Sequence, residues 1–372
     1  MKQIIWQPGY MGMVHLRDYY KLSREDQLAF LNGGNKTGRL FNVVESQQFN
    51  REKIDYLIKL AQAIKRLYEE PTEQGRKFLA SLLSHKRMIC YFAEASTRTM
   101  HSFVIAAKLL GISAKTEHQI QLSSMYKGET FSDTIRTLAQ YYDLFAIRHP
   151  KDDSSEKAIV AMNGIRESQR PILNAGSGSA QHPTQAFLDL LTIRDEVGRL
   201  DNLRIVIVGD PKYGRTVNSK VYLLVKNYKG NEFYFISPKQ LRIKDGLRES
   251  LNKHGAVYHE LETMDPEVLS KADVVYMTRV QKERLGFWER KLLYPTLKGR
   301  YIFTLDHLRS MKKGSIVMHP LPRVYEFQVE EYHDPDKVAI WRQVRNGVYM
   351  RAALIANIYG IDEEILLRAQ NT

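Results

Sequence analysis

Short runs of apolar residues recur along the chain, and most are separated by longer segments with apolar residues at every third or fourth position. The short runs are typical of buried strands, and the longer segments are typical of amphipathic helices. We expect strands at 88–92, 143–147, 171–174, 204–208, 233–236, 273–277 and 315–318. We expect helices at 51–70, 128–141, 154–163, 182–195, 215–226, 239–253 and 347–358.

This alternation predicts an α/β protein whose parallel sheets are flanked by helices. The number of strands favours two domains, each with its own parallel sheet, joined by interdomain helices. The expected parts are an N-terminal extension at 1–40, a first domain at 41–183 plus 345–372, a connecting helix at 184–197 and a second domain at 198–340.

Composition excludes several classes of protein. The 372 residues are 43% hydrophobic and 26% charged, which is ordinary for a globular protein in water. No apolar run is long enough to cross a membrane, and the first residues lack the pattern of a secretory signal, so we expect a cytoplasmic protein with no membrane partner. The single cysteine, Cys90, excludes an internal disulfide and a zinc site built from cysteines.

The net charge of +13 is compatible with nucleic acid, a membrane surface or small anionic substrates as partners. Lysines and arginines are spread along the whole chain, without a basic tail. We therefore assign most of the excess to solvated surface and expect no nucleic-acid partner, which leaves nucleic-acid binding as a remote alternative.

Six polar motifs follow predicted strands, at the positions where α/β proteins bind ligands. They are EASTRT (94–99), IRHP (147–150), NAGSGS with HPTQ (174–179 and 182–185), GDPKYGRT (209–216), TRVQKER (278–284) and MHPLPR (318–323). Their concentration at strand ends indicates a functional site.

EASTRT places the hydroxyls of Ser96, Thr97 and Thr99 around Arg98, where a helix is expected to begin. A helix N-terminus offers backbone N–H groups and positive dipole charge, so the array suits a phosphate dianion that Arg98 neutralises. In the alternative interpretation, Ser96 or Thr97 only caps the helix and Arg98 is solvated.

Two further motifs suit anions and carbonyl groups. Arg148 ends an apolar strand, where a guanidinium benefits from an anionic partner. His182 and Gln185 share a helix face, so His182 can donate to a carbonyl oxygen and Gln185 can accept from an amide. The alternatives are a surface arginine and a histidine that is incidental to helix capping.

Arg215 opens a helix after GDPKYG, at an end that favours anions. Arg279 and Gln281 alternate beyond a strand, which places both side chains on one side and suits a carboxylate. Each of these motifs is weak when it is taken alone.

In combination, the motifs resemble the aspartate carbamoyltransferase catalytic chain, of the aspartate/ornithine carbamoyltransferase superfamily. STRT, SxxxKGET (123–130), RHP, HPTQ, GDPKYGRTVNS, YMTRVQKER and HPLPR follow in the family's order, from about residue 41 to the C-terminus. The resemblance implies transfer of the carbamoyl group of carbamoyl phosphate to L-aspartate, giving N-carbamoyl-L-aspartate and phosphate in pyrimidine biosynthesis. It also implies a homotrimer with shared active sites, no metal and no cofactor, and it leaves open a separate regulatory chain.

The resemblance assigns roles to residues on both substrates. The phosphoryl group would be held by Ser96, Thr97, Arg98 and Thr99. The carbonyl oxygen would be polarised by Thr99, Arg148 and His182, which together with Arg98 form the expected catalytic set. The carbamoyl NH2 group would be held by Gln185 and the backbone around Pro320 and Leu321. The aspartate carboxylates would be bound by Lys127, Arg215, Arg279 and Gln281, with Ser123 and Lys127 reaching in from the neighbouring subunit.

Pro320 and the pair Arg279 and Gln281 match the aspartate enzymes rather than the ornithine enzymes, and Arg279 would repel the ornithine amine. Three positions depart from the family's usual residues: Met100 replaces an arginine, and Ser177 and Tyr325 replace aspartates. The alternatives are a carbamoyltransferase with another amino acceptor and a non-catalytic regulatory paralogue.

Overall fold

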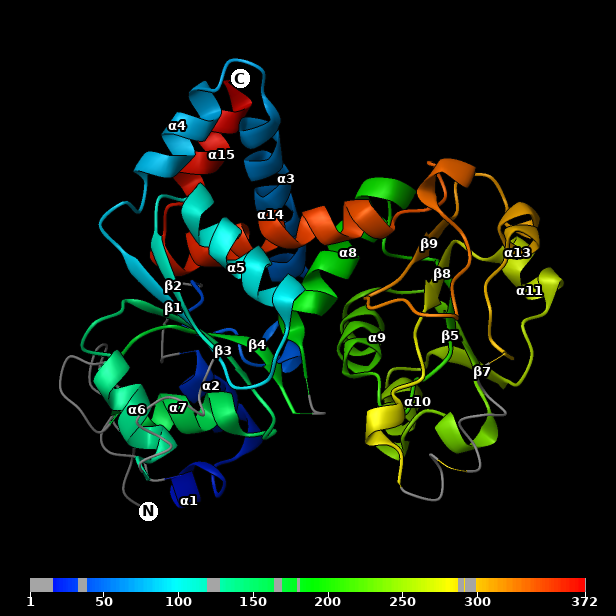
Figure 1. The fold of residues 1–372 in the computed structure, drawn as a ribbon, viewed down its shortest axis with the longest axis horizontal. Helices are drawn as coiled ribbons and strands as arrows, with labels where there is room; N and C mark the ends of the chain where they lie inside the picture. The colour runs from blue at the N-terminus through cyan, green and yellow to red at the C-terminus, as the bar shows by residue number, and fades with distance from the viewer. Residues whose placement is uncertain are drawn as a thin grey trace. The chain divides into compact units, whose positions relative to one another are not determined.

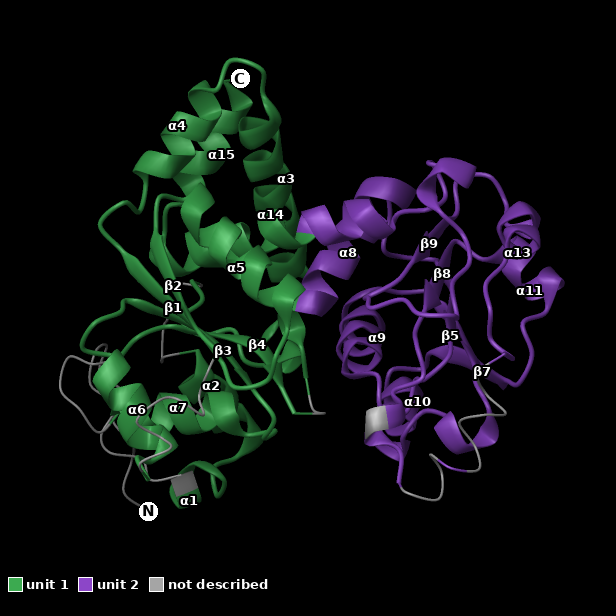
Figure 2. Ribbon diagram, in the orientation of Figure 1, with its two compact units in different colours: residues 1–184, 347–372 green, residues 185–346 purple. Residues whose placement is uncertain are grey.

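The computed structural model describes residues 16–32, 39–118, 128–163, 169–178, 181–286, 291 and 299–371. The chain forms two compact units, which Figure 2 colours separately: residues 1–184 with 347–372, and residues 185–346. It passes from the first unit to the second within helix α8 (Pro183–Val197) and returns within helix α14 (Ile340–Tyr359).

Unit 1 is built on a four-stranded sheet in the order β2-β1-β3-β4, and every pair of neighbouring strands is parallel. The strands are β1 (Arg87–Phe92), β2 (Ser113–Glu117), β3 (Leu144–His149) and β4 (Ile172–Ser177). Helices α6 (Phe131–Leu138) and α7 (Ser154–Asn163) cover one face, and α5 (Thr97–Leu109) covers the other (Figure 1). The remaining helices are α3 (Arg51–Glu69), α4 (Gln74–Ser81) and α15 (Asp362–Gln370), with a short 3-10 turn, η1 (Ser46–Gln48).

The described part of the N-terminal extension folds into unit 1. Helices α1 (Leu16–Tyr19) and α2 (Arg24–Leu31) bring Tyr19, Phe30 and Leu31 into the hydrophobic cluster of β1, β3 and α7. Ser23 caps α2, because its side chain accepts from the backbone N–H of Asp26. Residues 16–32 therefore contribute apolar side chains to the core of this unit.

Unit 2 has a five-stranded parallel sheet in the order β7-β6-β5-β8-β9. The strands are β5 (Arg204–Val208), β6 (Glu232–Ile236), β7 (Val257–Leu261), β8 (Val274–Met277) and β9 (Ile316–Met318). Helices α9 (Arg215–Asn227) and α10 (Asp245–Lys253) cover one face, and α11 (Pro266–Lys271) and α13 (Leu305–Ser310) cover the other (Figure 1). The predicted α/β class, with a parallel sheet flanked by helices in each part, is confirmed.

Two differences from the expected strands lie at the edges of the sheets. The pattern misses β2 and β7, and both are edge strands whose residues are exposed or only partly buried. Edge strands commonly carry polar residues, which removes the apolar run that marks a central strand. The helix expected at 239–253 is divided into a short 3-10 turn, Lys239–Leu241, and α10.

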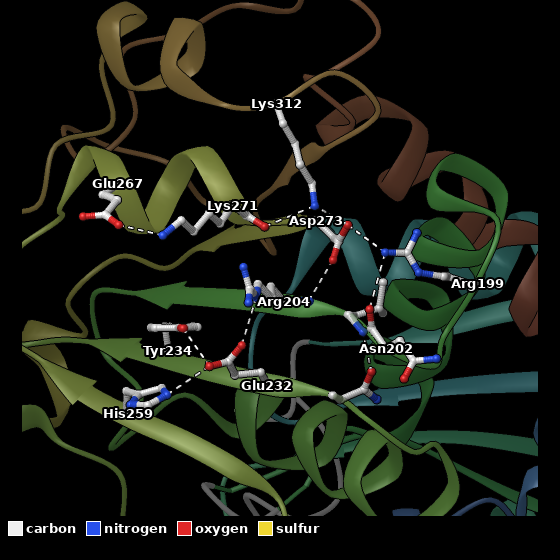
Figure 3. A network of polar contacts seen from close by, with 12 residues as sticks. Arg199, Asn202, Arg204, Glu232, Tyr234, His259, Glu267, Lys271, Asp273 and Lys312 are labelled. Atoms are coloured by element: carbon white, nitrogen blue, oxygen red, sulfur yellow. Dashed lines mark hydrogen bonds and ion pairs between the residues drawn. The ribbon is translucent and has the colours of Figure 1, made fainter.

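Several basic residues of unit 2 are paired in a polar network near the amino ends of the strands (Figure 3). The carboxylate of Asp273 accepts from the Arg199 guanidinium at 2.8 Å, the backbone N–H of Arg204 at 2.8 Å and the Lys312 ammonium at 2.7 Å. Burial alone would raise the pKa of Asp273, but these donors hold the pKa below its usual value. These cations therefore serve the fold. Among the described residues, no helix is both long and apolar enough to cross a membrane.

Candidate functional site

The carboxyl end of β1 leads directly into the N-terminus of α5, and EASTRT forms this junction. Ser96 is the residue before the helix, yet its side chain makes no capping hydrogen bond. Its hydroxyl instead donates to the Thr99 hydroxyl over 3.0 Å, while Thr97 and Arg98 are exposed and Thr99 is buried. The capping interpretation is therefore not supported for Ser96, and the first turn of α5 faces an array of hydroxyl groups.

Arg148 lies at the end of β3, directly beside the end of β1, because Phe92 and Arg148 are partners in the sheet. Its side chain is buried, which contradicts the alternative of a surface arginine. The guanidinium donates to the Glu94 carboxylate at 2.9 Å and to the Ala175 carbonyl oxygen at 3.3 Å. The sheet thus places a buried cation next to the EASTRT junction, and Glu94 balances its charge.

His182 is buried just beyond β4, where its Nδ1 lies 3.4 Å from the Thr184 hydroxyl. Ser177, at the end of β4, is also buried, and its hydroxyl donates to the Asn174 side-chain oxygen at 3.1 Å. The hydroxyls of Ser154 and Ser155 each lie 3.2 Å from the Ser177 hydroxyl oxygen. Ser177, one of the departures that the sequence analysis noted, is therefore part of a neutral hydroxyl cluster.

In unit 2, Arg215 begins α9 after β5, and Arg279 and Gln281 follow β8. These two loops are neighbours because β5 and β8 are adjacent strands. The buried carboxylate of Asp210 connects them, since it accepts from the backbone N–H groups of Tyr213 and Gln281, each at 3.0 Å. Burial raises the pKa of Asp210, while the two N–H donors act in the opposite direction.

The close approach of these two loops requires a glycine at position 209. Gly209 has a φ of 112°, and a Cβ at this residue would lie 2.0 Å from the carbonyl oxygen of Thr278. The Thr278 hydroxyl in turn accepts from the backbone N–H of Asp210 at 2.8 Å. The GDPKYGRT and TRVQKER motifs are therefore held together by the close backbone approach at Gly209 and by the Thr278 side-chain hydrogen bond.

The HPLPR motif follows β9, and His319 organises it. The Nδ1 atom of His319 accepts from the backbone N–H of Leu321 at 2.8 Å, which leaves Nε2 to donate to Glu326 at 2.9 Å. Leu321 has a φ of 59°, a left-handed conformation that is rare for this residue type. Burial raises the pKa of Glu326, but the His319 hydrogen bond and backbone donors keep the pKa below its usual value.

The structure groups the predicted residues by unit. Unit 1 holds Ser96, Thr97, Arg98, Thr99, Arg148 and His182 at the carboxyl edge of its sheet. Unit 2 holds Gln185 on α8, and Arg215, Arg279, Gln281, Pro320 and Leu321 at the carboxyl edge of its own sheet. Ser123 and Lys127 lie outside the described residues.

Sequence reasoning assigned no role to the supporting residues Glu94, Asp210, His319 and Glu326. Glu94, Asp210 and His319 stand inside the motifs at strand ends, and this position in the sequence is the signal that could have identified them. Glu326 gave no such signal because it follows HPLPR. The described residues contain no group of three or more His, Cys, Asp or Glu side chains that could hold a metal ion.

Two family models match the chain and together cover most of it. Residues 42–195 match the carbamoyl-phosphate-binding domain of aspartate/ornithine carbamoyltransferases. Residues 201–358 match the aspartate/ornithine-binding domain of the same family.

Similar proteins agree with these matches. The aspartate carbamoyltransferase catalytic subunit of Clostridium botulinum (strain Okra / Type B1) is 42% identical over 321 residues, which cover 86% of this chain and 98% of the relative. The chloroplastic aspartate carbamoyltransferase 1 of Pisum sativum is 40% identical over 85% of this chain and 78% of the relative.

A solved structure of aspartate transcarbamoylase from Trypanosoma cruzi, in complex with N-(phosphonacetyl)-L-aspartic acid, is also similar. It has a TM-score of 0.76 and 36% identity, and the match covers 88% of this chain and 98% of that chain. The catalytic subunit of M. jannaschii aspartate transcarbamoylase has a TM-score of 0.75 at 36% identity, over 87% of this chain and 99% of that chain. With both domain models matched in order, the chain belongs to the aspartate/ornithine carbamoyltransferase family.

Proposed function

We propose that this protein transfers the carbamoyl group of carbamoyl phosphate to the amine of L-aspartate. The observation that carries the proposal is the retention of all the predicted anion-binding residues in a chain whose similar relatives are named aspartate carbamoyltransferases. The product is N-carbamoyl-L-aspartate, and phosphate leaves with the electron pair of the broken C–O bond. The names of these relatives also support a place in pyrimidine biosynthesis.

Unit 1 supplies the carbamoyl phosphate residues in this proposal, with domain bounds of 41–183 plus 345–372. Ser96, Thr97 and Thr99 donate to the phosphoryl oxygens, and Arg98 supplies the counter-charge. Thr99, Arg148 and His182 polarise the carbonyl oxygen, on which negative charge develops as the amine attacks. Catalysis then consists of positioning and electrostatic stabilisation by groups that are fixed before the reaction.

Unit 2 supplies the aspartate residues, with domain bounds of 198–340 beyond a connecting segment at 184–197. Arg215, Arg279 and Gln281 are suited to the two carboxylates, and the buried Asp210 fixes the loops that carry them. Gln185 and the backbone around Pro320 and Leu321 accept from the carbamoyl NH2 group. Arg279 favours aspartate over ornithine, because a guanidinium attracts a second carboxylate and repels a second amine.

The proposal includes a homotrimer in which Ser123 and Lys127 act in the site of a neighbouring subunit. Mixing an inactive Lys127→Ala variant with an inactive Arg98→Ala variant tests this arrangement, because reassembled trimers would contain some intact sites. Recovered activity would support shared sites, and mixtures without any recovery would contradict them. Light scattering on the purified protein measures the oligomeric mass and any change on adding a regulatory chain.

We also propose a cytoplasmic location, which subcellular fractionation tests directly. The Pisum sativum relative is named chloroplastic.

Release of phosphate from carbamoyl phosphate tests the reaction, with aspartate, ornithine and other amines as separate acceptors. Release that depends on aspartate is expected. Release with a different amine only would favour a carbamoyltransferase with another acceptor. No release with any amine would contradict the catalytic proposal and favour a regulatory paralogue.

A further inference from the structure

One fully buried carboxylate in unit 2 gathers three side-chain donors. Asp189, on α8, accepts from the Gln185 amide NH2 at 3.0 Å and from the Gln343 amide NH2 at 2.7 Å, both at Oδ1. Its Oδ2 accepts from the Tyr276 hydroxyl at 2.7 Å. An ionised carboxylate can only accept hydrogen bonds, and all three of these side chains donate to it. Both carboxylate oxygens of Asp189 therefore have hydrogen-bond partners.

Gln343 connects Asp189 to the HPLPR segment through two hydrogen bonds. Its NH2 donates to Asp189, and its oxygen accepts from the backbone N–H of His319 at 3.0 Å. His319 begins the HPLPR motif and holds the backbone of Leu321 through Nδ1. A single carboxylate thus connects Gln185 with the Pro320 and Leu321 segment, which are the two groups proposed to accept from the carbamoyl NH2.

The bond to Asp189 also decides which end of the Gln185 amide faces outward. An amide donates through its NH2 and accepts through its oxygen, and the NH2 is already used by the carboxylate. The oxygen is the end that remains to accept from a substrate NH2 group. If the amide were rotated by half a turn, its oxygen would face the Asp189 carboxylate, and two acceptors would repel each other.

Lys220, on α9, lies beside this network in a fully buried position. Its ammonium lies 2.7 Å from the ring centroid of Tyr276 and has no hydrogen-bond partner among the described residues. Burial raises the pKa of Asp189, while Lys220 and the Tyr276 hydroxyl act in the opposite direction. Burial likewise lowers the pKa of Lys220, to about 7. The three hydrogen-bond donors around Asp189 favour its ionised form.

We propose that Asp189 is a positioning residue for carbamoyl phosphate: it orients the Gln185 amide directly and the Pro320 and Leu321 segment through Gln343. The inference rests on the proposed function, because it assigns Gln185 to the carbamoyl NH2 group. Asp189 itself is buried and touches no substrate in this role.

A double-mutant cycle between Asp189→Asn and Gln185→Ala tests the proposal. The wild-type protein is assayed first for turnover of carbamoyl phosphate and aspartate, which separately tests the proposed function. Asp189→Asn should raise the KM for carbamoyl phosphate about tenfold, and less than about threefold in the Gln185→Ala background. The KM for aspartate should change less than the KM for carbamoyl phosphate in every variant.

If both variants are folded and active and their effects on the KM for carbamoyl phosphate are additive, the proposal is overturned. A purely structural role for Asp189 would not depend on Gln185 and would give this additive result. Tyr276→Phe is the matched control, since it removes one donor to Asp189 without touching either amide. It should leave the KM for carbamoyl phosphate within about twofold of wild type. If Asp189→Asn does not fold, Gln343→Leu replaces it: a raised KM for carbamoyl phosphate supports the path to His319, and an unchanged KM contradicts it.

Discussion

The guanidinium of Arg148 donates to the carboxylate of Glu94 over 2.9 Å at the carboxyl edge of the unit 1 sheet. Arg148 is buried, and Glu94 is about one-third exposed. The pair therefore holds a buried cation in place. A substrate carbonyl oxygen that accepts from Arg148 meets a guanidinium whose position is already fixed.

Replacing Glu94 should therefore lower the turnover rate. Glu94→Ala is expected to reduce kcat about tenfold, because the guanidinium loses the contact that orients it. Glu94→Gln should reduce kcat by a smaller factor, since the amide oxygen can still accept from Arg148. Steady-state phosphate release measures both, with Glu52→Gln on the exposed face of α3 as the control for charge. An unchanged kcat in Glu94→Ala would contradict the orienting role.

Arg279 should act on aspartate and very little on carbamoyl phosphate. Arg279→Gln removes a charge-assisted contact to a carboxylate, so the KM for aspartate should rise about 10- to 100-fold. The KM for carbamoyl phosphate should stay within about twofold, since unit 1 supplies the phosphoryl-binding residues. Lys313→Gln removes the same charge from an exposed position in unit 2 and serves as the control. Equal increases in the KM for aspartate and the KM for carbamoyl phosphate would contradict the assignment of Arg279 to aspartate.

Asp210 should couple stability to aspartate binding. Asp210→Asn keeps the shape but replaces one acceptor oxygen with an NH2 group that faces a backbone N–H donor. The free energy of unfolding should fall by about 1–3 kcal/mol, and the KM for aspartate should rise because Gln281 loses its backbone anchor. Chemical denaturation and steady-state kinetics on the same samples measure the two effects. A destabilised variant with an unchanged KM for aspartate would restrict Asp210 to a structural role.

The central strands were predictable from sequence because their burial makes them continuous apolar runs. β1, β3, β5 and β8 differ from the expected bounds by two residues or fewer at each end. The edge strands β2 and β7 were not predictable from the sequence, because their exposed positions carry polar residues. Residues 16–32 were likewise not placed, since the apolar side chains of Tyr19, Phe30 and Leu31 show no strong helical pattern in so short a segment.

The same distinction applies to the site. Residues at strand ends, such as Arg148 and Arg279, stand out because a charge comes within two residues of the end of an apolar run. Asp189 and Gln343 do not stand out, because they lie inside helices and meet only after the chain has folded. The two are 154 residues apart in sequence, so no local pattern connects them.

Glu156, on α7, should make the stability of the protein depend on pH. One of its carboxylate oxygens, Oε2, has no hydrogen-bond partner among the described residues, and burial raises its pKa to about 7. That value of the pKa already includes smaller contributions: a backbone hydrogen bond and Arg24 lower it, while Glu45 and Asp153 raise it. The folded protein therefore binds a proton between pH 4.5 and 7 that the unfolded chain has released, so stability should fall as the pH rises through this window.

Glu156→Gln should remove this dependence, because a neutral amide resembles the protonated carboxyl group. Compared with wild type, the variant should gain about 1–3 kcal/mol in the free energy of unfolding at pH values above 7, and much less near the acid end of the window. Urea denaturation across the window measures the difference, with Glu52→Gln as an exposed carboxylate control. A gain that is the same at every pH would show that the substitution acts through packing, and a loss above pH 7 would contradict the buried, proton-binding state of Glu156.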